Sequence, residues 1–313
     1  MHTILNSITL APKKNMRFSV TLILALLLSV PSFGQFPLLG FGSKHFDNME
    51  GKTLSVIVSG NSVMDENLRS SFSEHWNFSK VEFISPEEMA HSITDENKYF
   101  FLSVNVSTTT EGQVLNSTRT NKYLIITRGG YKSIDKVDKR KWLFALPMDF
   151  FNDEQMIPDM SYRIEPCIKL MNDAMTTIRN EKIKIKSGPD GVKFMSNEFS
   201  KNFSRLKDKT LLINKSMVRR EDASYLDLSV RHRKSATEAE IREVYPYAIE
   251  VVDKSEIESA ISKNRKESAV LISLSFVNQI TMIFDTETLE TLYYTFNKSG
   301  LSLNKKDYKK FPL

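Results

Sequence analysis

Residues Ser204 to Lys207 match the pattern Ser-x-x-Lys, in which a lysine activates a serine as a nucleophile. Four-residue patterns of this kind recur by chance, and the Ser-Asp-Asn and Lys-Thr-Gly elements that accompany this nucleophile do not occur in the sequence. The four residues also lie in a stretch that repeats an earlier part of the chain, where Asp47 stands in place of the serine. We therefore interpret Ser204 and Lys207 as structural residues.

Other residues that could supply a nucleophile or bind a metal are sparse. Cys167 is the single cysteine and lies beside apolar residues at helical spacing, from Ile164 to Ile178, which predicts that it is buried. Four histidines outside the N-terminal segment show neither the His-Glu-x-x-His pattern nor the pairing of zinc sites: His45, His75, His91 and His232. His75 adjoins Trp76 on a predicted helix, so we expect a partly exposed packing role. Glycine-rich nucleotide-binding patterns do not occur either, and the sequence predicts no catalytic, cofactor-binding or metal site.

Two pairs of acidic residues have local explanations. Glu87 and Glu88 follow Ser85 at the start of a predicted helix, where negative charge is favourable. Asp285 and Glu287 flank a predicted turn. Carboxylates that are far apart in sequence can still meet in space, so a hydrolase that uses dispersed carboxylates stays an alternative.

Basic residues cluster in two places. An insertion in the second half of the chain carries Arg219, Arg220, Arg231, Arg233 and Lys234. The C-terminal residues 304–313 carry Lys305, Lys306, Lys309 and Lys310 together with Tyr308 and Phe311. Such runs can bind a polyanion or an anionic membrane surface, although solvated faces and frayed ends are more common.

The overall charge gives no reason to expect a nucleic-acid partner. The chain has 43 lysine and arginine residues against 38 aspartate and glutamate residues. Three of the basic residues, Lys13, Lys14 and Arg17, lie in the N-terminal segment, so the rest of the chain is nearly balanced.

The N-terminal residues 1–34 are typical of a secretory signal peptide. The basic residues are followed by the apolar run Val20–Val30, and Ser32 and Gly34 place small side chains before a cleavage point ahead of Gln35. The run is shorter than the roughly 20 apolar residues that span a bilayer. We therefore expect export to the periplasm or the cell exterior, cleavage between Gly34 and Gln35, and no transmembrane segment in the mature chain.

The chain contains a repeated stretch. Residues 46–58 (FDNMEGKTLSVIV) match residues 203–214 (FSRLKDKTLLIN) at one constant offset, which pairs Phe46 with Phe203 and the two Lys-Thr-Leu triplets with each other. Each copy leads into a short apolar run that predicts a buried strand. This repetition indicates a duplicated structural unit.

The same order of elements follows each copy. In the first, strands are predicted at 54–58, 81–84, 99–106 and 123–128, with a helix bearing Leu68, Phe72 and Trp76 and a second helix after a capping box at Ser85 and Glu88. Gly129 and Gly130 are predicted to form a tight hairpin. In the second copy, capping boxes at 237–240 and 253–256 alternate with strands, and a hairpin turns at 285–288.

These patterns predict an α/β (α+β) fold, a tandem duplication of a β-α-β-α-β-β unit with mixed sheets plus an intervening helix around 164–178. Ordinary α/β proteins also show this order, but side-chain identities accompany it here. The predicted division is a signal peptide at 1–34, a first unit at 35–186 and a second unit at 187–313, with the helix-breaking Ser187–Gly191 at the boundary.

The favoured function is that of an exported, soluble, non-catalytic binding or assembly protein. Its partner would be a protein or polymer outside the cytoplasm, held in a groove between the two copies. The alternatives are the hydrolase with dispersed carboxylates and the binding of a polyanion or anionic surface through the basic insertion and the C-terminal residues.

Overall fold

The computed structural model describes residues 48–58, 60, 62–110, 117–137, 141–148, 153–220, 235–275, 279–297 and 302–311. All of them belong to one compact unit, residues 36–313. The predicted signal peptide, its cleavage point and Phe46 lie outside the described residues, so export stays a prediction. The predicted boundary between Lys186 and Ser187 also stays a prediction.

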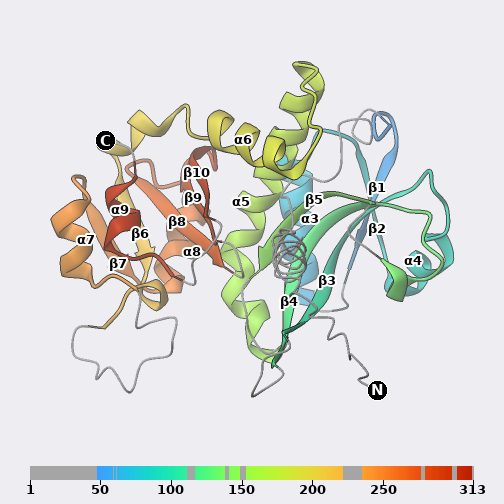
Figure 1. The fold of residues 1–313 in the computed structure, drawn as a ribbon, viewed down its shortest axis with the longest axis horizontal. Coiled ribbons are helices and arrows are strands. Elements are labelled where there is room, and N and C mark those ends of the chain that lie inside the picture. The colour runs from blue at the N-terminus through green and yellow to red at the C-terminus, as the bar shows by residue number, and fades with distance from the viewer. Residues whose placement is uncertain are drawn as a thin grey trace, which may run out of the picture. The chain divides into compact units, whose positions relative to one another are not determined.

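Helices and strands alternate in the same order in two parts of the chain (Figure 1). The first sheet unit and the elements after it are β1 Thr53–Ile57, α3 Ser62–His75, β2 Lys80–Ile84, α4 Pro86–Ser92, β3 Tyr99–Thr110, β4 Ser117–Arg128, η1 Ile134–Lys136, β5 Trp142–Met148, α5 Asp153–Asn180 and α6 Gly188–Glu198. The second sheet unit comprises η3 Phe203–Asp208, β6 Thr210–Asn214, η4 Lys215–Met217, α7 Glu238–Val244, β7 Ile249–Val252, α8 Lys254–Ser262, β8 Ser268–Ser275, β9 Gln279–Asp285, β10 Thr291–Asn297 and α9 Lys305–Lys309.

The two five-stranded sheets have one topology. The first has the order β2-β1-β3-β4-β5, and the second has the matching order β7-β6-β8-β9-β10. In each, the first strand is parallel to its two neighbours, and the last two strands are antiparallel additions. The mixed α/β fold is therefore confirmed, each unit has one strand more than the six-element pattern, and the two similar sheets fit the predicted tandem duplication.

The repeated stretch forms the same turn in both units. The backbone N–H of Lys52 donates to the carbonyl of Met49 at 3.1 Å, and that of Lys209 donates to Leu206 at 3.2 Å. Met49 and Leu206 are both completely buried. The repetition thus fixes how the chain turns into the first strand of each sheet, which supports a structural role for it.

Two predicted capping boxes are present, and a third helix start differs. In both boxes the N-cap hydroxyl accepts an N–H while a glutamate accepts the N-cap N–H, at Ser85 with Glu88 and at Thr237 with Glu240. Asp253 is the N-cap residue of α8 but makes no capping hydrogen bond with its side chain. Its carboxylate instead pairs with the Lys215 ammonium at 2.7 Å, so the capping prediction was wrong there.

The connection after β4 is longer than predicted. β4 ends at Arg128 and β5 begins at Trp142, so the two glycines do not form a tight hairpin. Gly130 does take a positive φ of 86°. Gly129 is required for a different reason, because a Cβ atom there would lie 2.2 Å from the Asp95 carbonyl oxygen. The glycines allow a close backbone approach at the sheet edge.

The helices of each sheet unit cover opposite faces of its sheet. The second and third strands flank the first on either side, so right-handed crossovers place the two connecting helices on opposite faces. Phe72 of α3 accordingly packs in a different cluster from Met89 of α4, and Ile241 of α7 in a different cluster from Ile257 of α8.

A single apolar cluster joins the two sheet units. It contains the α3 face of the first sheet and the α8 face of the second, together with the buried side of α5. Helix α5 contacts α3, α8 and β5. Because α8 corresponds in topology to α4, the sheets meet through non-equivalent faces. One apolar core therefore runs from the first sheet unit into the second among the described residues, and the groove between the copies stays a prediction.

Helices α5 and α6 differ from the prediction at their starts. Pro166 lies well inside α5, since this helix already begins at Asp153. The stretch Ser187–Gly191 starts α6, where Ser187 accepts the Asp190 N–H and the proline occupies the first turn. Within the described residues, no helix has both the length and the apolar composition to cross a membrane.

Candidate functional site

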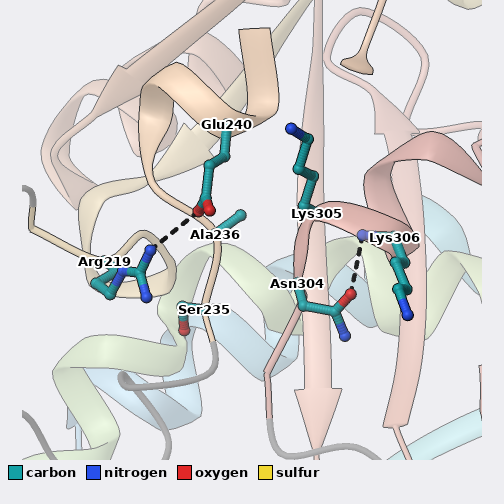
Figure 2. Close-up of a pocket in the computed structure, with 7 residues that line it drawn as sticks. All are labelled: Arg219, Ser235, Ala236, Glu240, Asn304, Lys305 and Lys306. Atoms are coloured by element: carbon teal, nitrogen blue, oxygen red, sulfur yellow. Dashed lines mark hydrogen bonds and ion pairs between the residues drawn. The ribbon is translucent and has the colours of Figure 1, made fainter. Parts of the chain in front are cut away.

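A pocket of ≈ 340 Å³ lies in the second sheet unit, beside helices α7 and α9 (Figure 2). Three segments that are far apart in the sequence contribute to it: the start of the basic insertion, the start of α7 and the start of α9. Its lining residues are Arg219, Ser235, Ala236, Glu240, Asn304, Lys305 and Lys306.

Backbone hydrogen bonds hold these three segments together. The N–H of Arg219 donates to the carbonyl of Ala236 at 2.9 Å, and the N–H of Ala236 donates to the carbonyl of Leu303 at 2.9 Å. Ala236 and Leu303 are both buried. The segment before α7 is thus bonded on one side to the insertion and on the other to the C-terminal segment, which places their basic residues around one pocket.

Three cationic side chains and one carboxylate line the pocket. Glu240 accepts from the Arg219 guanidinium at 3.1 Å and from the Thr237 N–H at 2.8 Å. Lys305 pairs with Glu243 at 2.5 Å, whereas the exposed Lys306 has no ion-pair partner among the described residues. The pocket therefore carries an excess of positive charge.

The lysines point away from each other, as Figure 2 shows, with Lys305 directed to one side of the α9 start and Lys306 to the other. Asn304 precedes them at the N-cap of α9, and its side-chain oxygen accepts the Lys306 N–H at 2.9 Å. The pocket therefore offers positive charge at separate points of its lining, from Arg219 and from the two lysines. Such an arrangement suits an extended anion.

The pocket lacks a matched acid and base among its lining residues. Its one carboxylate, Glu240, already serves the helix cap and the salt bridge to Arg219. A general base needs a titratable group that is free to take a proton from the substrate. Among its lining residues, the pocket thus offers positive charge and hydrogen-bond donors.

The C-terminal segment is part of the core, which corrects the expectation of a frayed end. Tyr308 and Phe311 are 1 % and 2 % exposed and pack in the cluster on the α7 side of the second sheet. Tyr308 lies on α9, and Phe311 follows just after the helix ends. The two aromatic rings are therefore unavailable for stacking on a ligand, and the lysines between them remain at the surface.

The other basic residues of the insertion are placed only in part. Arg220 is exposed at the end of the described segment. Arg231, Arg233 and Lys234 lie outside the described residues, as do His45 and His232.

The structure also brings together a group that sequence reasoning missed. His75 at the end of α3 places its Nε2 atom 2.7 Å from an oxygen of Glu165 on α5 and 3.9 Å from an oxygen of Glu74. One ligand atom from each residue lies within 4.8 Å of the other two. The two helices pair residues that are 90 positions apart, so no local pattern could have found the group.

The serine and lysine of the Ser-x-x-Lys pattern, Ser204 and Lys207, are both exposed on η3. The neighbouring basic residues Arg205 and Lys209, by contrast, form ion pairs with Asp285. Asp285 is fully buried and accepts from Arg205 at 2.7 Å and from Lys209 at 2.9 Å. It also accepts the Glu287 N–H at 2.9 Å, which agrees with the predicted turn role of this acidic pair.

The acidic pair at the start of α4 serves the helix. Glu88 completes the capping box. Glu87 is exposed, and hydrogen bonds from its own backbone N–H and from the Ser85 hydroxyl lower the pKa of its carboxyl group. His91 bonds the Glu87 carbonyl one turn earlier.

Cys167 is completely buried, and this burial raises the pKa of its thiol to about 12. The thiol is therefore protonated at neutral pH and shielded from reagents. We expect Ellman's reagent to detect no thiol in the folded chain at pH 8 and one thiol per chain in denaturant. Rapid reaction of the folded chain would contradict this burial.

Scans against protein-family models, curated proteins and solved structures find no match. The function is therefore argued from the pocket and from the side-chain clusters alone. The pocket is the stronger basis, because it joins the two basic features that the sequence singles out.

Proposed function

We propose that this chain is an exported, soluble, non-catalytic binding or assembly protein built from two related α/β units. Its second sheet unit binds an anionic group of a protein or polymer partner outside the cytoplasm. One observation carries this proposal: Arg219 from the insertion and Lys305 and Lys306 from the C-terminal segment line a single pocket.

The charge around the pocket supports an anionic partner. Carboxylate, sulfate and phosphate groups all accept the charge-assisted hydrogen bonds that arginine and lysine donate. Lys306 is exposed and unpaired among the described residues, so it can bind such a group without first breaking an ion pair. The near balance of charge over the remaining chain argues against a nucleic acid as the partner.

The test is retention of the full chain on immobilised heparin, which serves as a polyanion probe. The double variant Lys305→Gln, Lys306→Gln should elute at lower NaCl concentration than the wild type. A plot of the logarithm of retention against the logarithm of NaCl concentration has a negative slope, and the magnitude of this slope should fall by about 2 in the variant. The reason is that about one counterion is released for each lysine that contacts the polymer. Both substitutions leave the buried Tyr308 and Phe311 in place.

The matched control is Lys184→Gln, Lys186→Gln, which removes the same charge from two exposed lysines between α5 and α6. It should elute close to the wild type. The proposal would be overturned if the wild type did not bind heparin. It would also be overturned if both variants eluted at equally reduced NaCl concentration, because a loss of net charge without a specific site lowers retention by the same amount in each.

A further inference from the structure

The group formed by Glu74, His75 and Glu165 has the composition of a metal site. An imidazole nitrogen and two carboxylate oxygens come from two helices that pack directly on each other. Neutral imidazole and carboxylate are the ligands that zinc and neighbouring transition metals take in sites with three protein ligands.

Within the part of the chain that the structure describes, other cations do not balance the charges of this group. Two carboxylates face one imidazole, and no lysine or arginine among the described residues forms an ion pair with either Glu74 or Glu165. The next acid along α5 differs, because Asp173 is paired with Lys169 at 2.9 Å. His75 also stands at the C-terminal end of α3, where the helix dipole favours positive charge.

The two distances from the His75 imidazole bracket the spacing that a metal requires, and all three ligand atoms lie within 4.8 Å of one another. Ligands at about 2.0–2.1 Å from a tetrahedral zinc ion lie roughly 3.3 Å apart. The Nε2 atom of His75 is 2.7 Å from Glu165 and 3.9 Å from Glu74, on either side of that value. Small side-chain adjustments would therefore give three ligands without a change in the helices.

The exposure of the group allows a metal to enter and leave it. The side chains of His75 and Glu165 are 19 % and 31 % exposed, and that of Glu74 is 60 % exposed. Three protein ligands leave the fourth tetrahedral position to water or to a partner's side chain.

We propose that Glu74, His75 and Glu165 bind a divalent transition-metal ion of the zinc class between α3 and α5. The competing interpretation is a metal-free ion pair between His75 and Glu165 that fastens the two helices. Under both interpretations, replacing His75 would destabilise the protein, so a loss of stability does not distinguish them. The response of the protein to Zn²⁺ does.

The experiment measures the binding of Zn²⁺ alone to the full chain by calorimetry, and the thermal midpoint with Zn²⁺ and with EDTA. The wild type should bind Zn²⁺ and melt at a higher temperature with the ion present. His75→Ala and Glu165→Gln should each lower the affinity of this site at least about tenfold and remove the thermal shift. Co²⁺ bound to the wild type should give the visible absorption of a low-coordinate site, and His75→Ala should lose it.

The matched control is His91→Ala, which removes an exposed histidine on α4 next to two glutamates and should bind Zn²⁺ as the wild type does. If a variant unfolds, the other supplies the test, because Glu165→Gln keeps a hydrogen-bonding group beside His75. An unchanged thermal midpoint of the wild type with Zn²⁺, or equal Zn²⁺ binding in His75→Ala and the wild type, would overturn the proposal.

Discussion

Replacing Asp285 with alanine is expected to lower the free energy of unfolding by about 3–5 kcal/mol. The Asp285 carboxylate is completely buried, and the side chain of Lys209, whose ammonium group it neutralises, is only 9 % exposed. Removal of the acid leaves this largely buried lysine without its counter-ion. The cost of an unpaired buried charge exceeds the modest net gain from forming the pair.

The measurement is urea denaturation of the full chain, with Arg128→Ala as the control. Arg128 is the last residue of β4, and Asp285 is the last residue of β9, the strand at the same place in the order of the second sheet. Arg128 forms a more exposed pair with Glu96, so its loss should cost about 1 kcal/mol. If both variants lost the same free energy of unfolding, the buried pair at Asp285 would contribute no more to stability than the exposed pair at Arg128.

Replacing Asn172 with alanine is expected to cost about 2–4 kcal/mol. This residue of α5 is 4 % exposed, and its side-chain oxygen accepts the backbone N–H groups of Asn77 and Phe78 at 2.9 and 3.0 Å. Alanine would remove the acceptor of both N–H groups, and the N–H of the buried Phe78 would lose its partner away from solvent. It would also release the chain between α3 and β2 from helix α5.

The control for Asn172 is Asn180→Ala, which makes the same change at the exposed end of the same helix. It should change stability by no more than about 0.5 kcal/mol. Hydrogen exchange of the amides of Asn77 and Phe78 gives a local readout, and it should speed up only in Asn172→Ala. If the two variants are equally stable, the bridge contributes nothing measurable.

Local signals predicted the fold because each acts over a few residues. The Lys-Thr-Leu triplets, the capping boxes at Ser85 and Thr237 and the short apolar strands all depend on neighbours in sequence. The failed cap at Asp253 shows the limit of this reasoning, since a lysine from another segment took the carboxylate. Tertiary contacts override a local preference when they offer a stronger partner.

Local sequence signals could not predict the two candidate sites. The pocket depends on the backbone bonds that join Ala236 to the insertion and to Leu303, and these form only when the second sheet is complete. His75 and Glu165 meet because α3 packs on α5, not because of any spacing in the sequence. The sequence supplied the basic residues of the pocket, but the fold selected which of them converge.

The cluster that spans both sheets makes the duplicated units thermodynamically inseparable. Leu212 of β6 and Phe101 of β3 belong to one apolar interior, with Met175 of α5 among them. A chain cut after α6 would leave the face around Phe101 without the second sheet unit, and the excised second unit would expose Leu212. We therefore expect the two sheet units to melt in one cooperative transition.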